Sequence, residues 1–412
     1  MADLDVVEVV LKVTERCNIN CDYCYMFNMG NDDYKRLPKR IPDSTVQALV
    51  SFISDASRTN NIGLVRFIFH GGEPMLLPKK HFRKVCQTLR SGVADKVRCE
   101  FGMQTNGTLV DPAWIDLFEE LDLTPGVSMD GPPDLHDQHR IDFKGRGTYE
   151  QTIRGVNLLL DAASKKRIKA PGALCVVNPE HDGARVFSHC VDLGFQNVHF
   201  TLPITRLDDF TEAERLRLSR LLGGYLVGVL KAWILRKDTT IKVRILRRLM
   251  SLLSGGDEAA RADLEYERTR VRLFSVDTDG TVGPDDSMKP LVDLNLWRWN
   301  VATARFDEIF NSEPFVTLDR ESYATPDDCK PCAWNRVCRG GAFVGRIGNR
   351  YRARNAFNNA NFYCEGLRDI FANVSAILME AGLPYEKISS SLGLEHSLAA
   401  RQREIPAETL PA

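Results

Sequence analysis

Three cysteines stand close together near the start of the chain, at positions 17, 21 and 24. They directly follow the alternating apolar run 7–14, which predicts a β-strand. The loop after a strand is where α/β enzymes place their chemistry, and closely spaced thiolates suit iron–sulfur clusters. A 4Fe–4S cluster normally takes four cysteines, so three would leave one iron open for a small molecule. On spacing alone, a structural zinc ion and chance clustering remain alternatives.

A second group of cysteines lies near the other end of the chain. Its members are Cys329, Cys332, Cys338 and Cys364. Four cysteines with C-x2-C and C-x5-C spacings can supply a complete set of ligands to a cluster, and zinc is the physical alternative. The chain has eleven cysteines and an acidic N-terminus without a secretory pattern, which favours metal binding over disulfides.

Six strand-like segments in the first two hundred residues alternate with helix-like segments. The predicted strands are 7–14, 64–69, 98–104, 124–128, 173–178 and 197–202. This alternation predicts an α/β fold with a parallel sheet and right-handed crossovers. Polar and glycine-rich segments follow the strands, at the edge where a barrel of this kind carries its functional residues.

The cysteine triad, with the aromatic Tyr23 before its third cysteine, resembles the signature of the radical S-adenosylmethionine (SAM) enzymes. The resemblance implies a partial (β/α)6 TIM barrel, in agreement with the alternation of strands and helices. In that family the open iron of the cluster binds the amino and carboxylate groups of SAM. An electron from the cluster cleaves SAM to a 5′-deoxyadenosyl radical, which abstracts a hydrogen atom from the substrate. The cofactors supply this chemistry, and the protein supplies orientation and a dry cavity.

Further segments resemble the SAM-binding motifs of this family. Gly71-Gly72-Glu73-Pro74 resembles the motif that binds the amino group, and Arg140 stands where an arginine pairs with the carboxylate. A guanidinium suits a planar carboxylate because it donates two parallel hydrogen bonds. The alternatives are an ordinary turn for the motif, a surface arginine for Arg140 and a core leucine for Leu202. The predicted cofactor-binding residues are Tyr23, His70, Gly71, Gly72, Glu73, Asn106, Ser128, Arg140 and Leu202.

The C-terminal cysteines resemble the SPASM extension found in radical SAM enzymes that modify ribosomal peptides and sulfatases. Full SPASM domains hold two auxiliary clusters, but here Asp285 and Ala342 stand where the family has further cysteines. We therefore expect two 4Fe–4S clusters in total, one that binds SAM and one auxiliary. Asp286 aligns with an aspartate that accepts a proton in sulfatase-maturing relatives, and a simple turn aspartate is the alternative.

The sequence and the resemblance together predict four regions. They are a radical SAM barrel over 1–207, a helical bridge over 208–270, a SPASM-like auxiliary-cluster domain over 271–392 and a flexible tail over 393–412. The net charge of −1 gives no case for nucleic acid. No uncharged apolar run reaches the roughly 18 residues that span a bilayer, so we expect no membrane partner and a cytoplasmic location.

The motifs look most like those of maturases that join an aromatic ring carbon to a β-carbon in a ribosomally made precursor peptide, forming a cyclophane. The resemblance also implies an electron donor such as flavodoxin or ferredoxin. The alternatives are an anaerobic sulfatase-maturing enzyme that makes formylglycine, a thioether-forming peptide maturase, and a non-catalytic iron–sulfur scaffold.

Overall fold

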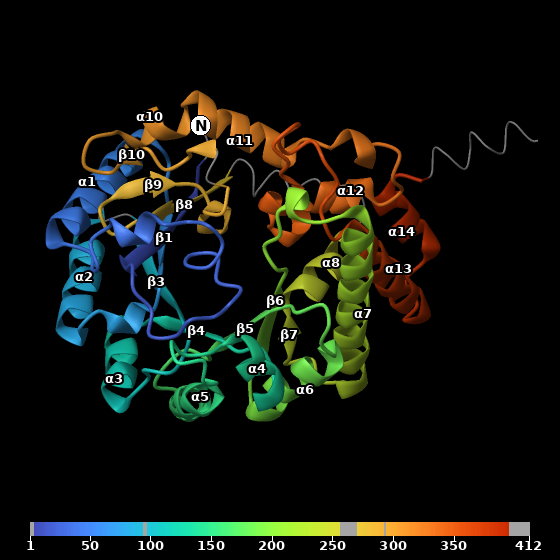
Figure 1. The fold of residues 1–412 in the computed structure, drawn as a ribbon, viewed down its shortest axis with the longest axis horizontal. Coiled ribbons are helices and arrows are strands. Elements are labelled where there is room, and N and C mark those ends of the chain that lie inside the picture. The colour runs from blue at the N-terminus through green and yellow to red at the C-terminus, as the bar shows by residue number, and fades with distance from the viewer. Residues whose placement is uncertain (1–3, 94–96, 256–269, 292–293, 395–412) are drawn as a thin grey trace, which may run out of the picture.

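A single curved sheet runs through the protein in the computed structural model, which describes residues 4–93, 97–255, 270–291 and 294–394 (Figure 1). The order of its strands is β10-β9-β8-β1-β2-β3-β4-β5-β6-β7. Their bounds are β1 Val6–Thr14, β2 Leu64–Gly71, β3 Arg98–Thr105, β4 Thr124–Ser128, β5 Gly172–Val176, β6 Asn197–Thr201, β7 Lys242–Val243, β8 Val271–Val276, β9 Thr281–Gly283 and β10 Trp299–Asn300.

Strands β1 to β6 confirm the six predicted strands and lie in sequence order, each parallel to the next. On β1 the residues Val7, Val9 and Leu11 are fully buried on one face, under the helices. Helices cover the outer side of the sheet (Figure 1). Their bounds are α1 Asp43–Thr59, α2 Lys79–Gly92, α3 Pro112–Leu121, α5 Tyr149–Ser164 and α6 Gly183–Leu193. The predicted α/β fold of a partial barrel is therefore confirmed.

One helix of the barrel was not predicted. Helix α4 spans Pro133–His139, where the sequence Gly131-Pro132-Pro133 indicates a turn. Pro133 occupies the first turn of the helix, where its fixed φ angle is compatible with helical geometry and its missing N–H costs nothing. Arg140 is the C-cap residue of this helix, and its backbone N–H donates to the carbonyl of His136.

Two further parallel strands flank the six barrel strands, and the antiparallel strands β9 and β10 lie beyond β8. Strand β7 lies beside β6, and β8 lies beside β1, with Val9 paired to Phe274. The region predicted as an auxiliary-cluster domain thus begins with a strand of the barrel sheet, and its division from the barrel stays a prediction. Part of the predicted bridge, 256–269, and nearly all of the predicted tail, 395–412, lie outside the described residues.

The long helix α7 (Glu212–Arg236) follows the barrel and begins with a capping box formed by Thr211 and Glu214. It packs against α6 and against α13 (Cys364–Glu380), with Gly223 close to Gly366. By length and composition, α7 is a helix that could cross a membrane, which the sequence analysis did not expect. Core helices pass the same test, and α7 is partly buried by its contacts with α6 and α13.

The remaining helices lie beside and above the sheet (Figure 1). Their bounds are α8 Arg244–Ser254, α10 Phe306–Phe310, α11 Glu313–Tyr323, α12 Asn335–Cys338 and α14 Tyr385–Leu392. Helices α8, α12, α13 and α14 contact one another and so join the C-terminal region to the end of the barrel.

Candidate functional site

The cysteine triad occupies the loop that follows the carboxyl end of β1. Cys21 is buried, and Cys17 and Cys24 are partly buried. The loop turns tightly, because the N–H of Cys24 donates to the carbonyl of Cys21 at 3.1 Å. At the end of β3, the side-chain amide of Asn106 donates to Asn18 at 2.9 Å and lies 3.8 Å from the sulfur of Cys17. The predicted residue Asn106 thus positions the loop of the first cysteine.

Gly71 and Gly72 let the end of β2 approach this loop. A Cβ atom on Gly71 would lie 2.1 Å from the Thr14 carbonyl oxygen, and one on Gly72 would lie 2.2 Å from the Arg16 carbonyl oxygen. Gly71 also has a φ angle of +131°, which side chains rarely adopt. The close approach expected of these glycines is therefore made to the backbone that leads into the cysteine triad.

The carboxylate of Glu73 is fully buried and accepts three hydrogen bonds within the protein. It accepts hydrogen bonds from Thr105 at 2.7 Å, from the N–H of Asn106 at 2.8 Å and from the N–H of Met75 at 3.1 Å. Burial raises the pKa of Glu73, and these hydrogen bonds act against that rise. Glu73 therefore ties β2 to the end of β3, and its predicted contact with an amino group stays a prediction.

Arg140 and Tyr23 meet beside the triad, together with Asp130. The guanidinium of Arg140 donates to the hydroxyl of Tyr23 at 2.7 Å and lies 3.7 Å from the Asp130 carboxylate. The hydroxyl of Tyr23 in turn donates to Asp130. Arg140 is only 5% exposed, and its Nε is buried without a hydrogen-bond partner among the described residues. A buried, unpaired donor is costly, so this guanidinium is suited to an anionic ligand.

Two other predicted cofactor-binding residues lie at neighbouring strand ends. Ser128 ends β4 and accepts a hydrogen bond from the Gln104 side chain at 2.9 Å. Leu202 follows β6 and is 1% exposed. Both lie on the edge of the sheet that carries the triad, and their contacts with SAM stay predictions.

Asp286 lies at the centre of a buried polar cluster, after the hairpin formed by β8 and β9. Its Oδ2 atom lies 2.8 Å from the Lys12 ammonium, 2.9 Å from the Tyr25 hydroxyl and 3.2 Å from Nδ1 of His70. Burial would raise the pKa of Asp286, but the positive charge of Lys12, aided by His70, holds it well below its usual range. The structure thus brings together the predicted residues Asp286 and His70.

Lys12 is the residue of this cluster that sequence reasoning missed. It is completely buried on β1, and its ammonium contacts Asp286 and the sulfur of Met26 at 2.7 Å. Burial acts to lower the pKa of Lys12, but nearby carboxylates, Asp286 first, raise it overall. A lysine within the apolar run 7–14 could have indicated this role, because a strand interior rarely buries an unpaired charge. Tyr25 was also missed, although it directly follows the triad.

The second cysteine group converges from several elements. Cys329 ends a short 3-10 helix, Cys338 ends α12 and Cys364 begins α13, while the Cys332 N–H donates to the Cys329 carbonyl at 3.1 Å. Burial raises the pKa of Cys338, and the negative charges that Cys364, Cys329 and Cys332 carry as thiolates raise it further. The four cysteines predicted as one ligand set are therefore neighbours in space.

A buried arginine lies beside this second group. Arg350 is 1% exposed and donates to the carbonyl oxygens of Phe357, Ser322 and Ala324 at 2.8 to 3.2 Å. Burial lowers its pKa, while the thiols of Cys329 and Cys338 act in the opposite direction. All three nitrogens of the guanidinium have partners, so Arg350 supports the fold around these cysteines.

The protein environment alone keeps the thiols of the triad protonated. Burial raises the pKa of Cys17 to about 12 and that of Cys21 to about 11. Such thiols stay protonated near neutral pH unless a metal supplies positive charge. Within the described part of the chain, no group of three or more His, Cys, Asp or Glu side chains could hold a single metal ion. The assignment of both groups to iron–sulfur clusters stays a prediction.

A family model described as the radical SAM superfamily matches residues 11–176, which hold the triad and the strand ends around it. The cysteine-type anaerobic sulfatase-maturating enzyme of Clostridium perfringens is 25% identical over 364 residues, 86% of this chain and 92% of that protein. The serine-type enzyme of Bacteroides thetaiotaomicron is 33% identical over 162 residues, 39% of this chain and 37% of that protein. The matched segment is therefore similar to the radical SAM superfamily, and the relatives matched along this chain are enzymes.

Solved structures share this fold. Native anSMEcpe with bound AdoMet has a TM-score of 0.75 and 22% identity, covering 91% of this chain and 98% of its own. Streptococcus suis SuiB bound to S-adenosylmethionine has a TM-score of 0.52 and 13% identity, covering 83% of this chain and 72% of its own. The architecture beyond the barrel is thus also found in known proteins.

Proposed function

We propose that the protein is a cytoplasmic maturase that cross-links an aromatic ring carbon to a β-carbon in a ribosomally made precursor peptide. Asp285 and Ala342, which stand where a second auxiliary cluster would need cysteines, favour cross-linking over formylglycine formation. The observation that supports a peptide-modifying reaction in general is the buried cluster around Asp286. It places one ionised carboxylate at the carboxyl ends of β1 and β2, next to the cysteine loop. A reaction that removes a proton from a peptide needs a base at this position.

Cofactor binding is assigned to the two cysteine groups and to Arg140. Cys17, Cys21 and Cys24 would hold the first cluster, and the unpaired Nε of Arg140 suits the carboxylate of SAM. The other four cysteines would hold the auxiliary cluster. When bound, SAM and the first cluster would supply a radical that abstracts hydrogen, and the auxiliary cluster would supply an electron acceptor.

Asp286 would accept the remaining proton of the cross-linking reaction. Joining two carbon atoms removes two hydrogens from the peptide, one as a hydrogen atom and the other as a proton and an electron. Because Lys12 keeps the pKa of Asp286 low, the carboxylate is ionised at neutral pH but is a weak base. It therefore suits a strongly acidic proton, such as one on a ring that is losing an electron.

Formylglycine formation is the second candidate, and the full-length similarity to the Clostridium perfringens enzyme favours it. The fold of this chain also resembles anSMEcpe with a bound Kp18Cys peptide, with a TM-score of 0.74. Against this candidate, Asp285 and Ala342 stand where a second auxiliary cluster would need cysteines. Both candidates require a peptide substrate and a base, so the geometry of Asp286 serves either reaction.

Product mass separates the two candidates. The reconstituted enzyme should be incubated without oxygen with SAM, a reduced flavodoxin and short peptides encoded next to its gene. Loss of two hydrogens without loss of a heteroatom is expected for a cross-link. Replacement of a cysteine or serine side chain by an aldehyde would instead establish formylglycine formation and contradict the cross-linking proposal.

A further inference from the structure

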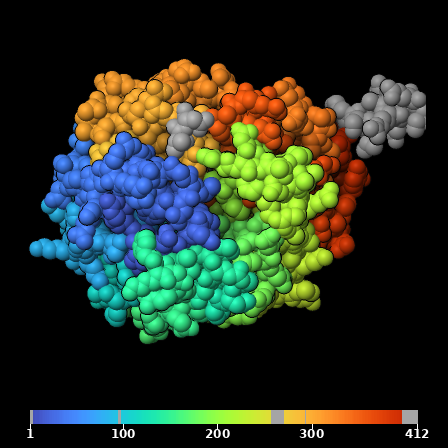
Figure 2. Space-filling model, in the orientation of Figure 1, coloured from blue at the N-terminus to red at the C-terminus, as the bar shows by residue number. Residues whose placement is uncertain are grey.

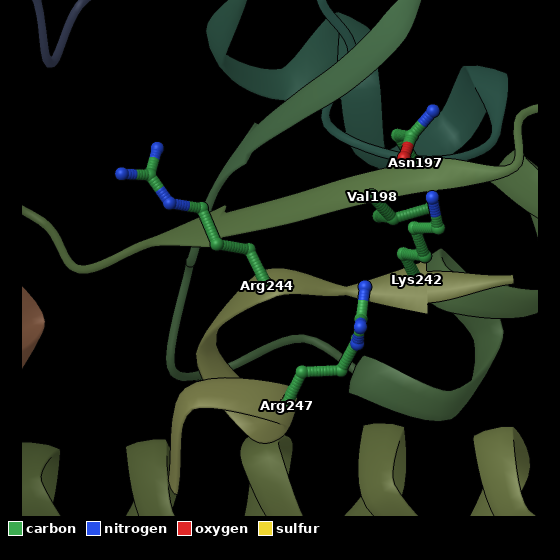
Figure 3. A pocket seen from close by; sticks show the side chains of 5 residues that line it. All are labelled: Asn197, Val198, Lys242, Arg244 and Arg247. Carbon is green, nitrogen blue, oxygen red and sulfur yellow. The ribbon is translucent and has the colours of Figure 1, made fainter. Parts of the chain in front are cut away.

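A small basic pocket lies at the start of strands β6 and β7, at the opposite end of β6 from the cysteine loop. Its volume is about 290 Å³. The residues that line it are Asn197, Val198, Lys242, Arg244 and Arg247 (Figure 3). Three of these five side chains are cationic. A volume of this size can hold one or two carboxylate side chains but not a folded partner.

The three cations are available for a ligand. Lys242, Arg244 and Arg247 are exposed, and none of them makes an ion pair with a carboxylate among the described residues. Other exposed arginines of this protein do have such partners, as Arg185 has in Asp134 and Arg167 in Glu119. Three unpaired cations around one cavity create a local positive potential that attracts anions.

The start of α8 adds to this potential. Arg244 is the first residue of α8, and the N-cap residue Val243 provides no side-chain cap for the N–H groups of the first turn. Free N–H groups and the helix dipole both favour negative charge at this end of a helix. In Figure 3, Arg247 reaches from α8 toward the strand that carries Lys242, and Arg244 extends in the direction in which β6 runs.

Strand β6 leads from the pocket toward the edge of the sheet that carries the cysteine loop. Asn197, His199 and Thr201 alternate along β6 on one face, and Leu202 follows at the end that faces the cysteine loop. Burial lowers the pKa of His199 to about 3, and the charges of Arg244 and Arg346 lower it as well. Arg346 has no carboxylate partner among the described residues, and its charge also acts on Tyr25. The charges of Arg244 and Arg346 therefore both act on His199, at the middle of β6.

This arrangement matches the length of a short extended peptide. Five residues separate Asn197 from Leu202, which corresponds to about 16 Å along the strand. An extended substrate would span the same distance with about five residues. The surface is hollowed near its centre between the blue N-terminal residues and the green and yellow residues of the middle of the chain (Figure 2).

We infer that the pocket of Lys242, Arg244 and Arg247 binds an acidic segment of the peptide substrate. The inference rests on the proposed function, because it assigns a recognition site to that reaction. Carboxylates of aspartate or glutamate would pair with the arginines, which can donate two parallel hydrogen bonds to each. The pocket would thereby fix which part of the peptide lies at Asp286.

Peptide binding can be measured without any chemistry. The probe is fluorescein-labelled hexaglutamate, added to the reconstituted, SAM-loaded enzyme at low salt and followed by anisotropy. Hexaglutamine is the uncharged control, and hexathymidylate tests for general attraction of anions. We expect hexaglutamate to bind at least about tenfold more tightly than either control, with an affinity that falls as salt is added.

The variant Arg244→Glu/Arg247→Glu reverses two charges of the pocket. Both residues lie in the first turn of α8, where glutamate is compatible with the helix dipole, so the helix should still form. We expect the dissociation constant of hexaglutamate to rise at least about tenfold. The matched control is Lys80→Glu/Lys387→Glu, which makes the same change of net charge at exposed positions on α2 and α14 and should leave binding unchanged.

Three results would contradict the inference. They are equal binding of hexaglutamate and hexaglutamine, equal binding of hexathymidylate, and unchanged hexaglutamate binding by the α8 variant. Slower reduction of that variant by flavodoxin, with normal hexaglutamate binding, would assign the surface to the electron donor instead. An enzyme that binds hexaglutamate through the pocket but cross-links no peptide would contradict the proposed function alone.

Discussion

Each of the two cysteine groups has one buried arginine beside it. The two arginines differ in how completely the protein satisfies the hydrogen-bond donors of their guanidinium groups. All three guanidinium nitrogens of Arg350 donate to backbone carbonyl groups, next to the C-terminal group. The guanidinium of Arg140 keeps a buried Nε without a partner among the described residues, next to the N-terminal triad. The difference indicates that the C-terminal site is closed by the protein itself, whereas the N-terminal site is prepared for an anionic ligand.

The largest expected difference between the two sites concerns SAM cleavage. Replacing Cys17, Cys21 and Cys24 by alanine should remove about half of an expected eight irons and abolish SAM cleavage. Replacing Cys329, Cys332, Cys338 and Cys364 should remove the other half but leave SAM bound. Iron analysis and 5′-deoxyadenosine formation check both variants. An iron content near about twelve in the unmodified protein would contradict the expectation of a single auxiliary cluster.

Arg350→Met should act on stability. The carbonyl groups of Ser322, Ala324 and Phe357 would lose their buried donor, which should lower the free energy of unfolding by about 2–5 kcal/mol. Denaturant unfolding of the reconstituted protein, followed by circular dichroism, provides the measurement. The dissociation constant of SAM should stay unchanged. Weakened SAM binding by a protein that keeps its stability would reverse the roles assigned to the two arginines.

Arg140→Ala should act on ligand binding. A hydrogen bond to a charged group contributes about 1.5–3 kcal/mol, so the dissociation constant of SAM should rise roughly 10- to 150-fold. Equilibrium binding of SAM to the reconstituted enzyme tests this expectation, and Arg185→Ala on the exposed face of α6 is the control. An unchanged dissociation constant would leave Arg140 as a residue that only orients Tyr23.

Lys12→Met should change the pH dependence of product formation. In the native protein Lys12 holds the pKa of Asp286 low, so the carboxylate stays ionised as the pH falls. Without that charge burial dominates and raises the pKa, and base function is lost as the pH falls through the raised value. Between about pH 8 and pH 5, the ratio of cross-linked product to 5′-deoxyadenosine should fall by up to about tenfold per unit.

A control is needed because removing one partner of a buried ion pair is also destabilising. Lys12→Arg keeps the charge and should restore the flat pH profile, provided that iron content is normal in both variants. An unaltered profile in a folded Lys12→Met protein would show that Lys12 does not govern the pKa of Asp286.

The sequence was sufficient to predict the central strands but not how the outer strands pair with them. Strands β1 to β6 follow from alternating apolar residues, and their order follows from the helices between them. Strand β7 has two residues and no periodic signal, and β8 pairs with β1 across more than 260 positions. Such long-range pairing has no local signature in the sequence. The predicted boundary at residue 271 therefore assigns β8 to a different region from its partner β1.

The cysteines and Asp286 were found from sequence, but the partners of Asp286 were not. Lys12 stands in an alternating strand, where a charged residue usually faces solvent. In this fold the alternate face of β1 lines the interior, and a carboxylate that follows β9 meets the lysine there. Only the folded structure shows that Lys12, Tyr25 and His70 all contact the same carboxylate oxygen of Asp286.

The measurement that tests the account most directly is the ratio of cross-linked peptide to 5′-deoxyadenosine for the variant Asp286→Asn. Asparagine keeps the shape of the side chain but removes the base, and loss of general-base catalysis slows a step by about 10²–10⁴-fold. We predict that both clusters and SAM cleavage persist, while cross-linked product falls by this factor in the same anaerobic assay. Near-normal cross-linking by this variant would contradict the role of Asp286 as the proton acceptor.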